Sequence, residues 1–370
     1  MERTCTRAIV LFETLVILLC FGFSLFGSVS PRISHEVSAS AEDYELHQCR
    51  FWAMISRSLP ERVVIDHLVN APYSLRNLGS YNVNGWGLAY YNDSEPAVRR
   101  GRPPASSDPN FALAAQELAE SGAHVGVGHV RMASSGAWNI PDPHPFMRFK
   151  NGKWWAFGHN GGVSGTLLKS LIGSEYLDQN PPTVGTNWSD PDVVDSDLYM
   201  LYVLKCTEEN HWNATLGIAK AVKDISANSY GGMNFFLTDG ETLWGFRRGN
   251  TLCYYYNESS TQYSVIASQP PTSSQENWIT LNDYNLITLT RDDAPSIIED
   301  IRTITFKITI RGDVNDDGRV DVKDLYAVAL TFGAFSGHSR WNSTADINGD
   351  LQVDVRDYYV VCRSFGKTEP

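Results

Sequence analysis

The sequence predicts an α+β protein with a large mixed domain and a small all-α domain at its C-terminus. Over residues 49–293, short strand-like runs alternate with amphipathic segments such as Pro109–Ser121 and Asp195–Cys206. Over residues 312–370 the chain repeats itself, which indicates two copies of one supersecondary unit. With 370 residues, 42% of them hydrophobic, the chain is long and apolar enough to fill both cores.

Strands in the large domain are expected where β-branched, aromatic and small apolar residues cluster. The expected strands are Trp86–Tyr91, His124–Arg131, Trp154–His159, Asn234–Thr238, Leu243–Arg248 and Tyr263–Ser268. Between the two domains, residues 294–311 are expected to form a linker or a strand, because the run Ile301–Ile310 alternates with a period of two.

The first 30 residues predict export. Basic residues precede an apolar run from Ala8 to Val29, which contains Glu13. The run is long for a cleaved signal peptide, so a cleaved signal and an uncleaved membrane anchor both stay open. Residues 31–48 are polar and Ser-rich and are expected to be a linker or a propeptide. Either alternative predicts a secreted or cell-surface protein.

The composition narrows the classes of partner. The chain has 30 Lys and Arg against 42 Asp and Glu, a net charge of -12, which argues against nucleic-acid binding through a broad basic surface. Five N-x-S/T sequons fit an exported glycoprotein. They start at Asn92, Asn187, Asn213, Asn257 and Asn342.

The cysteines beyond the leader are too widely spaced for a known zinc pattern. They are Cys49, Cys206, Cys253 and Cys362. The sequence leaves open whether Cys206 and Cys253 form a disulfide.

Two acidic loops of twelve residues, beginning at Asp313 and at Asp346, 33 residues apart, predict two calcium sites. Each loop has oxygen-bearing side chains at positions 1, 3, 5, 9 and 12 and offers the backbone carbonyl of position 7. Gly318 permits a sharp turn at position 6 of the first loop, whereas Leu351 occupies that position in the second and predicts a weaker site. The predicted ligands are Asp313, Asn315, Asp317, Arg319, Asp321 and Asp324, and Asp346, Asn348, Asp350, Gln352, Asp354 and Asp357.

A helical apolar stretch ending in Phe-Gly follows each loop, at Leu325–Gly333 and at Tyr358–Gly366. With these stretches, residues 312–368 resemble dockerin modules. The resemblance implies two Ca²⁺ ions in F-hand-like loops and a cohesin-like partner on a scaffold or cell-surface protein. Asp at position 12 of both loops fits dockerins better than ordinary EF-hands, which prefer Glu there.

The region from Cys49 to about Leu286 carries a series of motifs in one order. They are Cys49-Arg-Phe51, Asn84-Gly-Trp-Gly-Leu-Ala-Tyr-Tyr91, Gly128-His-Val-Arg131, His144-Pro-Phe146, Gly158-His-Asn-Gly161 and Asp195-Ser-Asp197. Together they resemble class II glutamine amidotransferases of the stand-alone type, which are N-terminal nucleophile hydrolases. The resemblance implies a four-layer αββα sandwich.

The same resemblance assigns roles to five residues. Cys49 would be the nucleophile, with its own α-amino group as the base, and catalysis would need no cofactor. Asn160 and Gly161 would donate hydrogen bonds to the oxyanion. Arg131 would bind the α-carboxylate of a glutamine-like substrate, and Asp195 its α-ammonium group.

The sequence departs from the family pattern at its most important position, because 48 residues precede Cys49. The mechanism requires cleavage between Gln48 and Cys49, and signal peptidase does not read the residues that precede this bond. Asn84 stands where the family usually has Asp, and Met132 where some members have Trp.

Simpler interpretations exist for the charged and histidine residues. Arg131 could be a surface ion-pair residue, and Asp195 could be a helix N-cap. His129, His144 and His159 are expected to be structural. For the whole chain, the leading hypothesis is an exported amidohydrolase of glutamine or a γ-glutamyl-type amide. The alternatives are hydrolysis of another acyl amide and a non-catalytic binding or structural component of an extracellular assembly.

Overall fold

A computed structural model describes most of the chain beyond the predicted leader and propeptide. It describes residues 48–92, 95–133, 136, 144–228, 231–259, 261–272, 276–304 and 311–368. Within these residues no helix combines the length and apolar character needed to cross a membrane. The apolar run of residues 8–29 and the propeptide before Gln48 lie outside the described residues.

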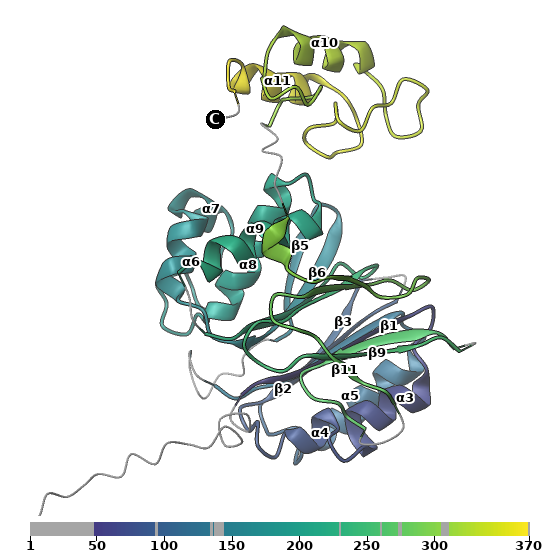
Figure 1. Ribbon diagram of the computed structural model, residues 1–370. Coiled ribbons are helices and arrows are strands. Elements are labelled where there is room, and N and C mark those ends of the chain that lie inside the picture. The colour runs from purple at the N-terminus through teal and green to yellow at the C-terminus, as the bar shows by residue number, and fades with distance from the viewer. Residues whose placement is uncertain are drawn as a thin grey trace, which may run out of the picture. The chain divides into compact units, whose positions relative to one another are not determined.

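Two antiparallel sheets form the centre of the large region (Figure 1). The first sheet has seven strands in the order β11-β9-β10-β1-β4-β2-β3. Their bounds are β1 Arg50–Ser56, β2 Trp86–Tyr91, β3 Ala97–Gly101, β4 Val125–Val130, β9 Cys253–Asn257, β10 Tyr263–Ala267 and β11 Ile279–Thr280.

The second sheet has six strands in the order β13-β12-β8-β7-β6-β5. Their bounds are β5 Phe146–Lys150, β6 Lys153–Gly161, β7 Met233–Thr238, β8 Leu243–Phe246, β12 Leu286–Leu289 and β13 Ser296–Ile298. No disulfide joins Cys206 to Cys253.

Helices cover the outer face of each sheet (Figure 1). Against the first sheet lie α3 Glu61–Ile65, the π-helix η1 Asp66–Asn70, α4 Leu75–Leu78 and α5 Pro109–Glu120. Against the second lie α6 Gly165–Ile172, α7 Ser174–Gln179, α8 Asp195–Glu209 and α9 Ala214–Ser226.

Three apolar clusters fill the spaces between the layers in the described residues. One joins the first sheet to its helices, one joins the second sheet to its helices, and the third fills the space between the sheets with residues such as Phe51, Val127 and Phe236. The α+β class predicted from the sequence is therefore confirmed. All six predicted strands form, each within three residues of the predicted ends.

Of the two alternatives for residues 294–311, a linker or a strand, the strand does not form at the first residues of the alternating run. Ile301–Thr303 form a 3-10 helix, η2, because the Asp300 side chain accepts a hydrogen bond from the Arg302 N–H and starts a turn there. Ile301 is fully buried and packs in the cluster beneath the second sheet. Residues 305–310 lie outside the described part of the chain.

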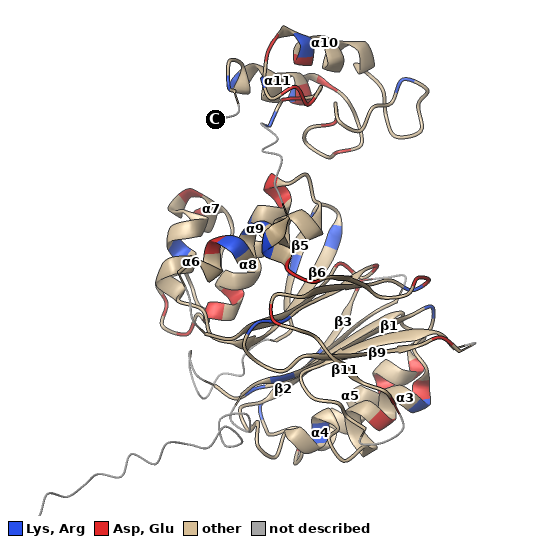
Figure 2. Cartoon of the chain, in the orientation of Figure 1, with Lys and Arg blue, Asp and Glu red and all other residues tan. Residues whose placement is uncertain are grey.

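The C-terminal module, residues 311–368, is built from two similar halves. Helices α10 (Val322–Thr331) and α11 (Val355–Ser364) each begin at position 10 of an acidic loop, three residues earlier than the sequence predicts. A small cluster that includes Val320, Val328 and Val361 forms the core between them. Positions with Lys or Arg and positions with Asp or Glu both occur along the helices in view (Figure 2).

Candidate active site and calcium loops

Cys49 lies immediately before β1, where the chain enters the first sheet. Its half-buried thiol donates to the carbonyl oxygen of Met132 at 3.3 Å, and the Met132 N–H contacts the sulfur at 3.4 Å. The carbonyl oxygen of Gln48 accepts a hydrogen bond from the buried Asn82 side chain at 2.5 Å. The peptide bond ahead of the cysteine is therefore held by the fold on both sides.

Asn84 joins the segment before β2 to the residues after β4. Its side-chain oxygen accepts the N–H of Ala133 at 2.9 Å, which a carboxylate oxygen could also do. Its backbone N–H donates to the carbonyl of Arg131, whose own N–H donates to Gly85, both at 3.0 Å. These bonds align the end of β4 with the segment before β2.

Asn160 and Gly161 end strand β6. The side chain of Asn160 is 1% exposed, and its oxygen accepts a hydrogen bond from Asn250 Nδ2 at 3.1 Å. Among the described residues, its amide nitrogen Nδ2 is buried and has no hydrogen-bond partner. A Cβ on Gly161 would lie 1.9 Å from the carbonyl oxygen of Gly232, so only glycine fits there. A buried donor without a partner is costly and is expected where a ligand atom completes the site.

Three histidines connect the two sheets and a helix behind the end of β6. The rings of His129 and His144 stack at 4.1 Å, and His129 Nε2 lies 3.2 Å from the carbonyl oxygen of His159. His159 Nδ1 is 3.0 Å from the hydroxyl of Ser196 on α8. Burial, and then the positive neighbours His159 and Arg131, hold the pKa of His144 well below its usual value.

Arg131 is 3% exposed, so it is not a surface ion-pair residue. Asp195 is the first residue of α8 and not its N-cap, which is Val194, and its Oδ2 accepts the N–H of Val163 at 2.8 Å. The two segments meet at Gly136, where a Cβ would lie 3.3 Å from Arg131 Nη2 and 2.4 Å from a methyl of Val194. The fold therefore brings the predicted carboxylate-binding and ammonium-binding residues into one neighbourhood.

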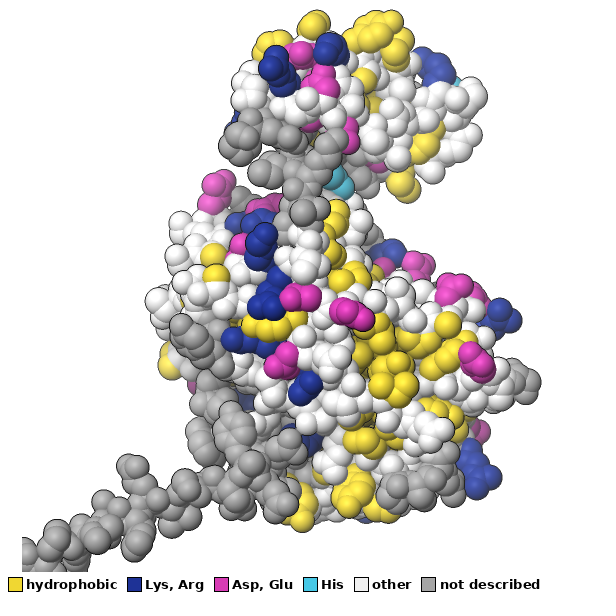
Figure 3. All heavy atoms as spheres, viewed as in Figure 1, with side chains coloured by type: hydrophobic (Ala, Val, Ile, Leu, Met, Phe, Trp, Pro, Cys, Tyr) yellow, Lys and Arg dark blue, Asp and Glu magenta, His cyan; other side chains and the backbone are white. Residues whose placement is uncertain are grey.

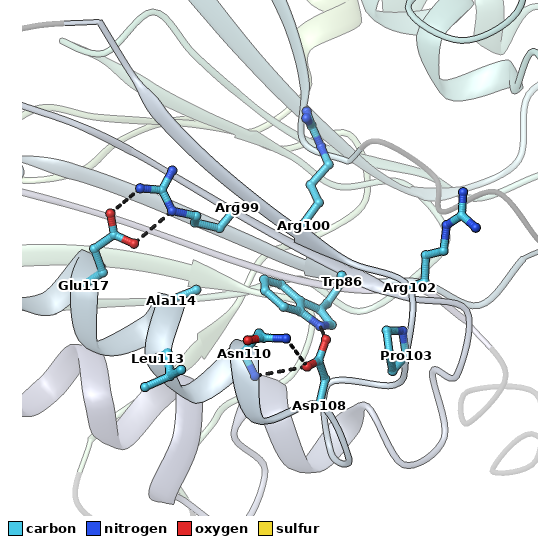
Figure 4. Close-up of a pocket in the computed structure, with 11 residues that line it drawn as sticks. Trp86, Arg99, Arg100, Arg102, Pro103, Asp108, Asn110, Leu113, Ala114 and Glu117 are labelled. Atoms are coloured by element: carbon cyan, nitrogen blue, oxygen red, sulfur yellow. Dashed lines mark hydrogen bonds and ion pairs between the residues drawn. The ribbon is translucent and has the colours of Figure 1, made fainter.

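A pocket opens beside Asp195. Its lining comes from the turn that follows β6, from α6 and from the start of α8, and it includes Gly162, Ser164 and Lys169. A second pocket, between β3 and α5, is lined by Arg99, Arg100 and Arg102 (Figure 4). None of the residues predicted for catalysis or substrate binding lines this second pocket.

The two acidic loops of the module have the same backbone. Positions 4 and 6 of each adopt left-handed φ: Asp316 at 61° and Gly318 at 80° in the first, Gly349 at 76° and Leu351 at 65° in the second. The position-12 carboxylates of Asp324 and Asp357 are fully buried and each accepts three backbone N–H groups from its own loop.

The donor set of these loops fits calcium in kind, because it consists of carboxylate, amide and carbonyl oxygens around a loop of twelve residues. No group of three or more His, Cys, Asp or Glu side chains close enough to hold a metal ion is found in the described part of the chain. The loop carboxylates accept backbone N–H groups instead, as Asp313 does from Gly318 at 2.8 Å.

Sequence reasoning missed the asparagines that support the site. Asn82 holds the carbonyl of Gln48, while Asn234 and Asn250 surround Asn160. None belongs to a motif, and Asn250 is 90 residues from Asn160. The pairing register that puts Asn234 opposite Asn160 is visible only in the folded sheet.

The profile of the family "Glutamine amidotransferases class-II" matches residues 74–259, which are 186 of the 370 residues. The chain belongs to the class-II glutamine amidotransferases. The profile of the dockerin type I domain matches residues 311–365 of this amidotransferase. Both resemblances seen in the motifs are thereby confirmed. Dockerin domains as a class bind cohesins and generally bind calcium.

The chain is also similar to a curated protein of low sequence identity. An uncharacterized protein of Methanocaldococcus jannaschii is 27% identical over 177 residues, covering 47% of this chain and 45% of that protein. The amidotransferase thus spans less than half the length of that curated relative.

The chain is also similar to two solved structures, of which the first supports the fold. A structure described as the allosteric regulatory enzyme of purine biosynthesis is 14% identical, with a TM-score of 0.50 over 68% of this chain and 48% of that one. A glutamine aminotransferase class-II domain protein from Silicibacter pomeroyi is 19% identical, with a TM-score of 0.43 over 68% of this chain and 98% of that one.

Proposed function

We propose that this amidotransferase is an exported cysteine amidohydrolase that hydrolyses glutamine or a γ-glutamyl-type amide, held to a cohesin-like partner by its C-terminal module. The observation that carries the proposal is the buried amide nitrogen of Asn160, which has no partner among the described residues. Asn160 adjoins Gly161 at the end of β6, and Cys49 lies immediately before β1. The two strands belong to different sheets, and they approach each other where Phe51 of β1 packs against Phe236 of β7, the strand that pairs with β6.

The reaction begins with a chain whose first residue is Cys49. The free α-amino group takes the thiol proton, and the sulfur attacks the carbonyl carbon of the substrate carboxamide. The negative oxygen that forms accepts hydrogen bonds from Asn160 Nδ2 and the N–H of Gly161, each contributing about 3 kcal/mol to transition-state stabilisation. Collapse of this intermediate expels ammonia, which carries the proton away and leaves a thioester on Cys49.

Water then attacks the thioester, and the α-amino group accepts its proton. The second tetrahedral intermediate uses the same two donors and releases a carboxylic acid and the Cys49 thiol. Arg131 would hold the substrate α-carboxylate with two parallel hydrogen bonds, and Asp195 would hold the α-ammonium group. Burial of the Arg131 side chain supports this role, since an ion pair out of water is stronger.

The module would bind one Ca²⁺ ion in each loop through the twelve predicted ligands. The ions would hold the loops in place of a larger core, as small modules commonly require. We further propose that the bond between Gln48 and Cys49 is cleaved after export by a protease or autocatalytically, and that the apolar leader directs the protein out of the cytoplasm.

Docking to the partner is proposed through the outer faces of α10 and α11. Val322 and Tyr326 on α10 are 66% and 64% exposed, and Val355 and Tyr359 at the matching positions of α11 are 65% and 60% exposed. Hydrophobic side chains are visible on the surface of this module in Figure 3. Exposed apolar residues at equivalent positions of both halves support a protein partner.

The test is N-terminal and intact-mass analysis of protein secreted from a native-like host, followed by incubation with glutamine and measurement of glutamate. We expect a mature chain that begins at Cys49 and releases glutamate, whereas Cys49→Ala would be secreted but release none. A chain that retains Gln48 and shows no turnover would instead support the non-catalytic binding component.

A further inference from the structure

The orientation of the Asn160 side chain decides whether the predicted oxyanion site has a donor, because its amide has an acceptor at one end and a donor at the other. The contacts of Asn250 determine this orientation. Asn250 Nδ2 lies 3.0 Å from the backbone carbonyl oxygen of Asn160. A carbonyl can only accept, so the atom that faces it must be the NH₂ group of Asn250.

The same NH₂ group lies 3.1 Å from the side chain of Asn160, whose nearer atom must therefore be the oxygen. The nitrogen of Asn160 is then turned the other way, where it is buried and has no partner in the described residues. We propose that Asn250 is a positioning residue that holds the Asn160 amide with its nitrogen toward the oxyanion. This inference rests on the proposed hydrolase function.

The position of Asn250 is itself fixed by the fold. Asn234, which is fully buried and directly opposite Asn160 in the β6–β7 pair, donates to the carbonyl of Asn250 at 2.9 Å and accepts the N–H of Arg248 at 2.8 Å. Gly232 leaves the space that the Asn250 side chain fills, because a Cβ there would lie 2.7 Å from Asn250 Nδ2. Asn250 is thus presented to Asn160 by a loop with little freedom to move.

The test replaces Asn250 with aspartate, which has the same size but only accepts. A carboxylate would draw the Asn160 nitrogen toward itself and leave the oxygen facing the oxyanion. In mature chains, we expect Asn250→Asp to lower kcat for glutamine roughly 100- to 1000-fold with little change in KM, as expected for a lost oxyanion donor. Asn250→Ala frees the Asn160 amide without reversing it, so this variant should lower kcat less than Asn250→Asp does.

Asn285→Asp is the matched control. Asn285 is buried, and its NH₂ group, like that of the partly exposed Asn250, donates to a backbone carbonyl, that of Glu299 at 2.6 Å. It does not contact the proposed site, so its variant should keep the wild-type kcat. Alkylation of Cys49 by iodoacetamide displaces iodide at carbon and forms no oxyanion, so its rate should be the same in all variants.

A role limited to packing would predict the opposite pattern, in which the same-sized Asn250→Asp retains activity and Asn250→Ala does not. That pattern, or a parallel fall of kcat and alkylation rate, would overturn the inference. Neutron diffraction of wild type and Asn250→Asp locates the amide deuterons directly. If the wild type releases no glutamate, the proposed function fails, and the inference is still decided by whether the Asn160 amide is reversed in the variant.

Discussion

The amidotransferase region and the C-terminal module stabilise their structures by different means. In the described residues of the former, thirteen strands and their helices enclose three apolar clusters, and buried polar side chains such as Asn234 are satisfied by the backbone. In the module, one small cluster supports two loops whose fully buried carboxylates, Asp324 and Asp357, bring negative charge into the interior. The first region is therefore expected to fold on its core alone, whereas the second is expected to need its cations.

Removal of calcium should give the largest difference between the two regions. We expect a chelator to abolish or strongly lower the thermal transition of the module, because the loop carboxylates would repel one another, while the transition of the amidotransferase region stays in place. Scanning calorimetry with and without added Ca²⁺ measures both transitions. The double variant Asp313→Ala, Asp346→Ala should lose the response to the chelator. A chelator effect on both transitions, or on neither, would contradict the comparison.

The amidotransferase region should be most sensitive where its backbone is tightly packed. Gly161→Ala would place a Cβ 1.9 Å from the Gly232 carbonyl oxygen, and we expect it to destabilise this region by about 2–3 kcal/mol. Gly152→Ala is the control, because Gly152 also has a positive φ of 72° but nothing within 4 Å of the added atom. It should cost only about 1 kcal/mol. Denaturant midpoints measure both, and equal losses would show that packing against Gly232 is unimportant.

Acidification should weaken the amidotransferase region through His144. Its pKa is held below the usual value of about 6.5 in the folded protein, so the unfolded chain binds the proton more readily. Stability from this group is complete above about pH 6.5 and is lost as the pH falls below it, by at most about 1.4 kcal/mol per pH unit. Thermal unfolding between pH 8 and 5 tests this. The slope should be smaller in His144→Gln, and an unchanged slope would assign it to other groups.

The smallest predicted effect distinguishes the two loops from each other. Leu351→Gly should stabilise the calcium-bound module by about 1 kcal/mol, since a leucine at a φ of 65° is strained and glycine is not. Gly318→Ala at the equivalent position should destabilise it by a similar amount. The Ca²⁺ titration of each variant should shift only the site that carries the change. If Leu351→Gly and Gly318→Ala changed the stability of the module in the same direction, position 6 would not have the same role in the two loops.

Clusters of β-branched, aromatic and small apolar residues predicted β2, β4, β6 and β7, and an amphipathic pattern predicted α5. β1 was not predicted although all of its residues are buried, as they are in β2, β4 and β7, and the two-residue edge strand β11 is too short to give a sequence signal. The strand predicted from Ile301 failed because Asp300 caps a turn, a local hydrogen bond that outweighs a period of two.

The sequence predicted those residues of the candidate site that belong to a short motif, and missed those that do not. Cys49, Asn160 and Asp195 stand in short motifs that resemble those of a known family, and their residue types suggest their chemistry. Asn250 could not be found in this way, because it acts through two hydrogen bonds to a residue 90 positions away, and asparagine in a loop is usually only a turn former.

The hydrogen bond from Asn82 to the carbonyl of Gln48 has a consequence for how the proposed enzyme would mature. Asn82 is buried after α4, so it can hold the peptide bond ahead of Cys49 only once that part of the chain has folded. If the proposed cleavage takes place, the uncleaved chain would be a zymogen whose own fold presents the activation site. Folding would act as a checkpoint, since a misfolded copy would never offer that bond in the shape that a maturation protease or the neighbouring thiol could cut.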